Sequence, residues 1–150
     1  MDIISKIMDI DCYLQSINAS RSSSMNEDAI KSVELKRNVS HKVNVPRRKS
    51  DHFSVAITDR ITFNPDKGPF KIEIILGANI ALLEAMSPAE ITSLIKIKKN
   101  VLSIINQCLP HSSAIIAHIT DKMGFSPVIF SPRIAMENIG FNDESRLSRR

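Results

Sequence analysis

The sequence predicts an α+β fold in which four antiparallel strands form one sheet and helices then cover one of its faces. Before residue 84, apolar and polar residues alternate in four segments, as they do in strands that bury one face. Beyond residue 100, apolar residues recur at steps of three and four, as on the buried side of a helix. No connection before Phe70 resembles a crossover helix, so the strands should run antiparallel.

Each of the four alternating segments carries its apolar residues on one parity. The first three sets are Met8, Ile10, Cys12 and Leu14; then Val33, Leu35, Val39, Val43 and Val45; then Phe53, Val55, Ile57, Ile61 and Phe63. Arg37 and His41 interrupt the second set, and Asp59 interrupts the third. From Phe70 to Leu82 every even-numbered residue is apolar, and Gly77 in the middle suggests a bend or a bulge.

Helical signals follow the fourth strand. Ser87-Pro88-Ala89-Glu90 has the pattern of a capping box with proline at the first helical position, within a crossover over Met86–Lys99. The apolar stripe from Val101 to Met123 predicts a long helix, which Pro110 must either kink or restart. Gly124 just beyond the stripe is a typical helix stop.

The remaining residues predict an extended segment and a short helix. Ser126–Pro132 contains two prolines and should lie extended across the sheet. Arg133–Ile139 could form a short C-terminal helix that Gly140 ends. We therefore expect one domain over residues 1–140 and a flexible basic tail over residues 141–150.

Composition excludes several classes of protein. The longest apolar runs are four residues, too short to span a membrane. Charged residues near the N-terminus argue against a secretory signal, and two distant cysteines argue against a disulfide framework or a zinc ribbon. We expect a cytoplasmic protein without a cofactor.

Sequence signals for catalysis are weak. The four glycines cannot supply a phosphate-binding loop or a dinucleotide fingerprint. His111 and His118 share a helix face but lie about 10 Å apart along the axis, too far to hold one metal ion alone. Cys108 lies three residues before His111, but a cysteine on an apolar stripe usually packs in the core. We expect neither an enzyme nor a metal site.

Two motifs resemble those of the SecB-type protein-export chaperones. They are Leu109-Pro110-His111-Ser112-Ser113-Ala114-Ile115-Ile116 and Gly124-Phe125-Ser126-Pro127-Val128-Ile129-Phe130-Ser131-Pro132. The family has Phe-Pro-Tyr-x-Arg at the helix, then a Gly-Phe-Pro-Pro turn and a Leu-x-Pro extended segment, at a spacing that this chain preserves. His111, Ser113 and Ser126 depart from that pattern. The order of strands, crossover, long helix, extended loop and short helix is also similar.

The resemblance implies a homotetramer, a dimer of dimers, that binds unfolded preproteins without nucleotide or metal. Residues implied at the interfaces between copies are Met8, Ile10, Cys12, Ser112, Ile115, Ile116 and Ile119. The family is acidic and uses that charge to dock the translocation motor SecA, whereas this chain has a net charge of +4. A solitary SecB-like chaperone that guards an antitoxin is at least as similar.

The fourth strand and the crossover carry more apolar residues than one buried face needs, and a holdase must expose apolar surface to unfolded chains. Candidate client-binding residues are Ile75, Ala81, Leu83, Met86, Ile91, Leu94, Ile95, Ile97 and Phe125. Alternatively, Ile91–Ile97 simply caps the core.

Two other classes of function stay open. A nucleic-acid-binding domain could use the basic stretch 36–49, which has six Lys or Arg and no acid. Its weakness is that six Phe and one Tyr, most assigned to the core, leave few rings for base stacking. An adaptor subunit that binds one folded partner would instead ignore unrelated unfolded proteins.

Overall fold

The computed structural model describes residues 2–22, 34–64, 68–131 and 139–140. In chain order the elements are η1 (Ile3–Lys6), β1 (Ile7–Arg21), β2 (Glu34–Asn44), β3 (Ser50–Asn64), β4 (Phe70–Met86), α2 (Pro88–Ile95), α3 (Lys98–Lys122) and β5 (Ile139–Gly140). The sheet order is β1-β4-β3-β2-β5, and the first four strands pair antiparallel, as the alternating segments predicted. Only β5 pairs parallel, with β2, among the described residues.

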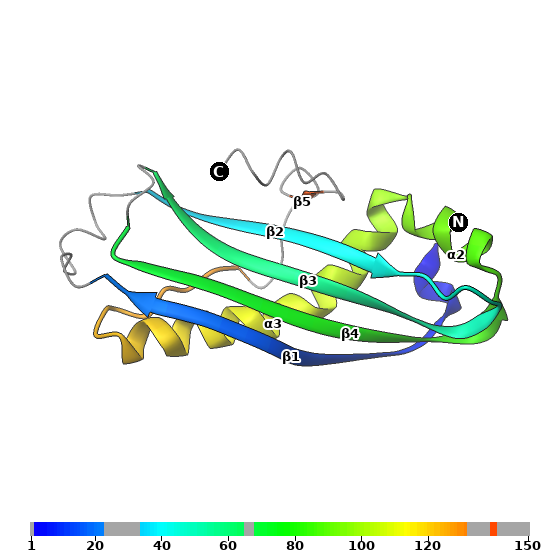
Figure 1. Cartoon of the computed structure of the whole chain (residues 1–150), viewed down its shortest axis with the longest axis horizontal. Helices are drawn as coiled ribbons and strands as arrows, with labels where there is room; N and C mark the ends of the chain where they lie inside the picture. Colours follow the sequence, from blue (N-terminus) through cyan, green and yellow to red (C-terminus); the bar gives the residue numbers. More distant parts are fainter. Residues whose placement is uncertain (1, 23–33, 65–67, 132–138, 141–150) are drawn as a thin grey trace.

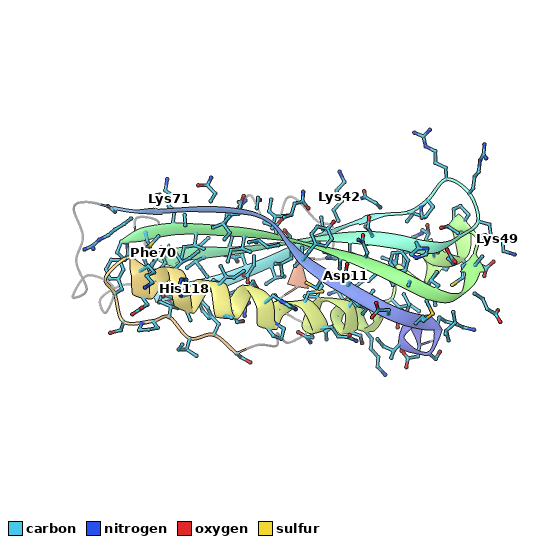
Figure 2. All side chains as sticks on the ribbon, turned by 90° about the horizontal axis from the view of Figure 1, so that it is seen from below. Asp11, Lys42, Lys49, Phe70, Lys71 and His118 are labelled. Atoms are coloured by element: carbon cyan, nitrogen blue, oxygen red, sulfur yellow. The ribbon has the colours of Figure 1, made fainter. Side chains whose placement is uncertain are left out.

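The long helix α3 lies along one face of the sheet (Figure 1). Figure 2 shows the sheet edge-on, with α3 below it and Lys42 and Lys71 pointing away on the opposite face. We call these the helix face and the outer face. The apolar parity of β3 and β4 points to the helix face, and the even-numbered residues from Phe70 to Leu82 are all buried there. Residues of α3, including Ile105, Leu109 and Ile116, complete this core.

The edge strand β1 has two register shifts against β4, one at Met8 and one at Gln15, and each changes the parity of the strand. Leu14 pairs with Leu76 and Ser16 with Ile75, so Gln15 is the extra residue between them. Ile17 therefore takes over the helix face from Leu14, although one residue is even-numbered and the other odd.

The bulge expected at Gly77 is wrong. Gly77 pairs with Tyr13 on one side and Ala56 on the other without a register shift. A Cβ atom at position 77 would instead overlap the ring of Tyr13. The glycine makes room for a neighbouring aromatic ring on the outer face.

The predicted helix ends are confirmed. The Ser87 hydroxyl accepts a hydrogen bond from the Glu90 backbone N–H at 3.2 Å. Gly124 has a φ of 89°, in the left-handed region that ends helices. Between these ends, α3 continues through Pro110 rather than restarting there.

Several expectations for the chain termini and loops lie outside the described residues. These include Val33, most of the short helix expected over Arg133–Ile139, and the tail 141–150. The last residue of that expected helix, Ile139, lies instead in β5, where it pairs with Val39 of β2.

A buried ion pair explains two of the interruptions in the strand pattern. Arg37 of β2 donates from Nε and Nη2 to the carboxylate of Asp59 in β3, at 2.7–3.0 Å. Their side chains are 6% and 0% exposed. The Ser112 hydroxyl of α3 accepts from Arg37 at 3.0 Å and donates to Asp59 at 2.6 Å. The charges are thus paired and bonded, as buried charges must be.

Replacing Asp59 by Leu should strongly destabilise the chain, because the Arg37 guanidinium would stay buried without its counter-charge. The expected loss of unfolding free energy, measured in urea, is about 3–5 kcal/mol, and the double variant Arg37→Met/Asp59→Leu should recover much of it. Glu73→Gln, at the more exposed Arg60–Glu73 pair, is the control and should cost about 1 kcal/mol or less. Equal losses at the two pairs would contradict the structural role of the buried one.

His41, the other interruption, should make the stability of the chain depend on pH. Its side chain is buried, and burial lowers its pKa below the ordinary value of 6.5. As the pH falls through 6.5, His41 takes up a proton in the unfolded chain before it does so in the folded chain. Protonation therefore favours the unfolded chain, and the free energy of unfolding should fall as the pH drops from 7.5 to 5.5. His41→Leu should show a shallower decline in urea titrations. His118→Gln, at an exposed site, should keep the wild-type decline, and identical slopes for all three proteins would refute this origin.

Candidate functional site

Eight large apolar side chains are exposed in the described chain. Three of them, Met8, Leu14 and Ile17, belong to β1, and we call them the edge surface. We use the name end surface for the exposed Leu83 of β4 and Ile97 between α2 and α3. The other exposed large apolar residues in the described chain are Ile4, Tyr13 and Ile129. An exposed large apolar side chain is a candidate contact for another polypeptide where further apolar side chains lie beside it.

The edge surface exists because β1 lies at the margin of the sheet. Leu14 and Ile17 pair with Leu76 and Ile74 of β4, whose side chains are fully buried. The β1 residues share the same face but lie beyond the cover that α3 provides, so they remain 46% and 43% exposed.

A flank of α3 continues the edge surface. Cys108 of α3 lies within hydrogen-bonding reach of Cys12 of β1, which fixes the side of the helix that faces this strand. Ile115 and Ile119 lie seven and eleven residues further on, on the same side of the helix, and are half-buried. Burial raises the pKa of both thiols, which favours their protonated form.

The structure divides the residues expected at interfaces between copies. Met8 is exposed, whereas Ile10, Cys12, Ile115 and Ile119 are half-buried. Ser112 and Ile116 are fully buried within the chain, because Ser112 bonds to Asp59 and Ile116 packs in the core. These two side chains are not available to a second copy in this structure.

The expected client-binding residues divide in the same way. Leu83 is 60% and Ile97 is 40% exposed, and Ile75 and Ala81 are half-buried on β4. The other five, Met86, Ile91, Leu94, Ile95 and Phe125, are buried in the core. The short helix α2 caps the end of the core, so its apolar face is used internally, as the alternative interpretation held.

The outer face is hollowed near one end. A shallow cavity of about 540 Å³ is lined by Asp9, Asp11, Asn44, Val45, Pro46, His52, Phe53, Ser54, Asn79 and Ala81. Its lining mixes carboxylates, amides and apolar groups. In the described residues, no group of three or more His, Cys, Asp or Glu is arranged to hold a metal ion.

The sequence reasoning placed Phe125 in a site but did not include the extended segment Ser126–Ser131 that follows it; Phe125–Ser131 is one extended segment in the structure. We call it the strap, because it turns back from the end of α3 toward β2 (Figures 1 and 2). The Val128 backbone N–H donates to the Thr120 hydroxyl, and Arg37 Nη1 donates to the Ser131 carbonyl, both at 2.8 Å. The signal that could have found it is the run of three apolar residues, Val128, Ile129 and Phe130, between two prolines.

The basic stretch 36–49 is weaker as a phosphate-binding surface than its composition suggested. Arg37 is committed to the buried pair with Asp59, which leaves Lys36, Lys42 and the loop residues Arg47, Arg48 and Lys49. Lys42 points outward on the outer face (Figure 2).

Comparison with known proteins identifies the fold. No protein-family model matches the chain, and no curated protein matches it in sequence. Among solved structures it is similar to a SecB-like chaperone of Mycobacterium tuberculosis, in complex with a ChAD peptide from the HigA1 antitoxin. The TM-score is 0.66 at 10% identity, over 88% of this chain and 91% of the other. The fold is SecB-like.

The SecB-like fold agrees with the order of elements that the helix and turn motifs suggested. The helices of this chain that the structure describes include none both long and apolar enough to cross a membrane. What the site offers is therefore a set of apolar surfaces and backbone-binding groups on a SecB-like scaffold.

Proposed function

We propose that this protein is a holdase chaperone that binds non-native polypeptides through exposed apolar surface. The observation that carries the proposal is that Leu83 and Ile97 stay 60% and 40% exposed although the core of the chain is filled by other apolar residues. The SecB-like fold of a chaperone seen with a bound peptide supports it. Unfolded chains expose apolar side chains. Burying these side chains against such a surface contributes about 25 cal/mol of favourable free energy per Å² of apolar area removed from water.

The binding residues proposed are the ones that a client can reach. These are Leu83 and Ile97, with Ala81 two residues before Leu83 and Ile75 further back along β4. Exposed or half-buried side chains on a preformed surface can exchange contacts with many sequences, since apolar attraction has no direction. No nucleotide or metal is needed for such binding.

The client class that we favour is an antitoxin or a similar unstable polypeptide, in the cytoplasm. The structural neighbour was solved with an antitoxin peptide. Docking to SecA through an acidic surface fits this chain less well, because its net charge is +4. Unfolded preproteins are the second client class.

We further propose that copies of the chain associate through the edge surface into a dimer of dimers. The fifteen-residue strand β1 is an edge strand: within the described chain, β4 pairs with one of its edges and no strand pairs with the other. Such an edge, with apolar side chains beside free backbone groups, favours association with another chain.

The holdase proposal predicts that the protein suppresses aggregation of a chemically unfolded client upon dilution, measured by light scattering. Leu83→Ser/Ile97→Ser should weaken client binding about tenfold or more, because two apolar contacts are removed. Lys71→Ser, an exposed polar position on the same strand, is the matched control and should bind as the wild type does. Failure of the wild type to delay aggregation at any ratio would sink the proposal.

Assembly predicts a native mass four times the chain mass of 16.8 kDa, measured by light scattering after size exclusion. Leu14→Asp/Ile17→Asp should reduce that mass, because two charges would enter an apolar contact. The same double change should leave the far-ultraviolet circular dichroism intact, since both side chains are exposed in the single chain. A wild type that runs as a monomer at micromolar concentration would contradict this assembly.

A further inference from the structure

The strap is bound to the body of the chain through its own backbone. Two of its polar contacts use the Val128 N–H and the Ser131 carbonyl, whereas the body supplies the side chains of Thr120 and Arg37. A backbone carbonyl occurs at every residue of any polypeptide, and an N–H at every residue except proline. These two hydrogen bonds therefore do not depend on which side chains the bound segment carries.

The apolar part of the contact follows a simple alternation. Val128 and Phe130 are half-buried and pack against the core, while Ile129 between them is 76% exposed. The Arg37 guanidinium lies 5.4 Å from the centroid of the Phe130 ring. An extended segment with apolar residues at alternate positions would make the same contacts.

The strap has the dimensions of an extended chain lying along the helix. Thr120, which contacts Val128, lies eight residues from Ser112, which contacts Arg37; this is about 12 Å along α3. Three extended residues from Val128 to Ser131 span about 10 Å. The strap thus runs antiparallel to the end of α3 and reaches the guanidinium at β2.

Arg37 can lose the strap without losing the buried network. Its Nε and Nη2 atoms hold Asp59 and Ser112, and only Nη1 bonds to the Ser131 carbonyl. Release of the strap would leave the ion pair intact and present one donor to whatever replaces it. The Thr120 hydroxyl would likewise become an acceptor, since its own proton is donated to the Ile116 carbonyl.

The start of the strap is anchored at Phe125, so any displacement would involve the residues that follow it. Phe125 is buried, with its ring centroid 5.6 Å from that of Phe70, and the Arg21 guanidinium lies over it at 4.7 Å. Gly124 immediately before it holds the left-handed turn. Motion would therefore begin after Phe125, over Ser126–Ser131.

We propose that the strap occupies a binding site for an extended polypeptide with apolar residues at alternate positions, and that such a client displaces it. This inference rests on the proposed holdase function and adds a second contact region to the end surface. When a site is filled by its own chain, the apparent affinity for a client is the affinity of the open site multiplied by the fraction of molecules in which the site is open. Only a client that binds the site well enough to displace the strap would then be held, and weakly apolar chains would not.

The test uses a fluorescent peptide with the sequence of residues 125–131, Phe-Ser-Pro-Val-Ile-Phe-Ser, and its anisotropy on the full-length protein. Val128→Ser/Phe130→Ser loosens the strap and should bind the peptide at least about tenfold more tightly than the wild type, because more molecules have an open site. Ile129→Ser changes the neighbouring side chain that points to solvent and should behave as the wild type does.

A second measurement needs no variant. Hydrogen exchange of the Val128 amide in the wild type should accelerate when an unfolded client saturates the protein, because the bond to Thr120 is broken. If the wild type holds the client but neither the peptide affinity nor the Val128 exchange changes, the strap inference fails and the holdase proposal stands. If no variant holds an unfolded client, the proposed function fails, and the strap inference, which rests on it, fails too.

Discussion

The arrangement of this domain depends on one buried ion pair. Arg37 and Asp59 bring a full positive and a full negative charge onto the helix face of neighbouring strands, and the Ser112 hydroxyl bonds to both. Two charges removed from water tolerate little error in position, since each needs the other at hydrogen-bond distance. The pair therefore fixes how α3 sits on β2 and β3, where apolar contacts alone would allow sliding.

The same pair couples the core to the surface. Arg37 donates from Nε and Nη2 to the buried network and from Nη1 to a backbone carbonyl of the strap. A guanidinium is suited to this because its donors point in fixed, separate directions. The guanidinium is thus oriented before any polypeptide arrives, and a client would not have to order it. Pre-organisation of this kind lowers the entropic cost of binding.

Much of the fold was predictable because it follows from period and local chemistry. The parity of Phe70–Leu82, the capping box at Ser87 and the stop at Gly124 each depend on near neighbours, and each was confirmed. The bulge at Gln15 was not predictable, since it depends on how β1 meets β4.

The candidate site was less predictable than the fold. Met86, Ile95 and Phe125 are residue types that would suit either a client-binding surface or a core. Their burial becomes visible only once the positions of α2 and the strap are known. Arg37 and Asp59 were visible as interruptions of opposite charge on adjacent strands. Read together, they would have indicated a buried pair, because lone charges do not survive on an apolar face. The interruptions carried more information than the regular positions around them.

The ring of Tyr13 lies over Gly77 on the outer face, in the space that a side chain would otherwise fill. A side chain at position 77 cannot be added while the Tyr13 ring stays where it is, whereas Tyr13 can change while glycine remains. Wherever a relative carries alanine or a larger residue at the position of Gly77, the aromatic ring opposite should have moved aside or have been replaced by something small. Such a relative would present a differently contoured exterior on an unchanged interior.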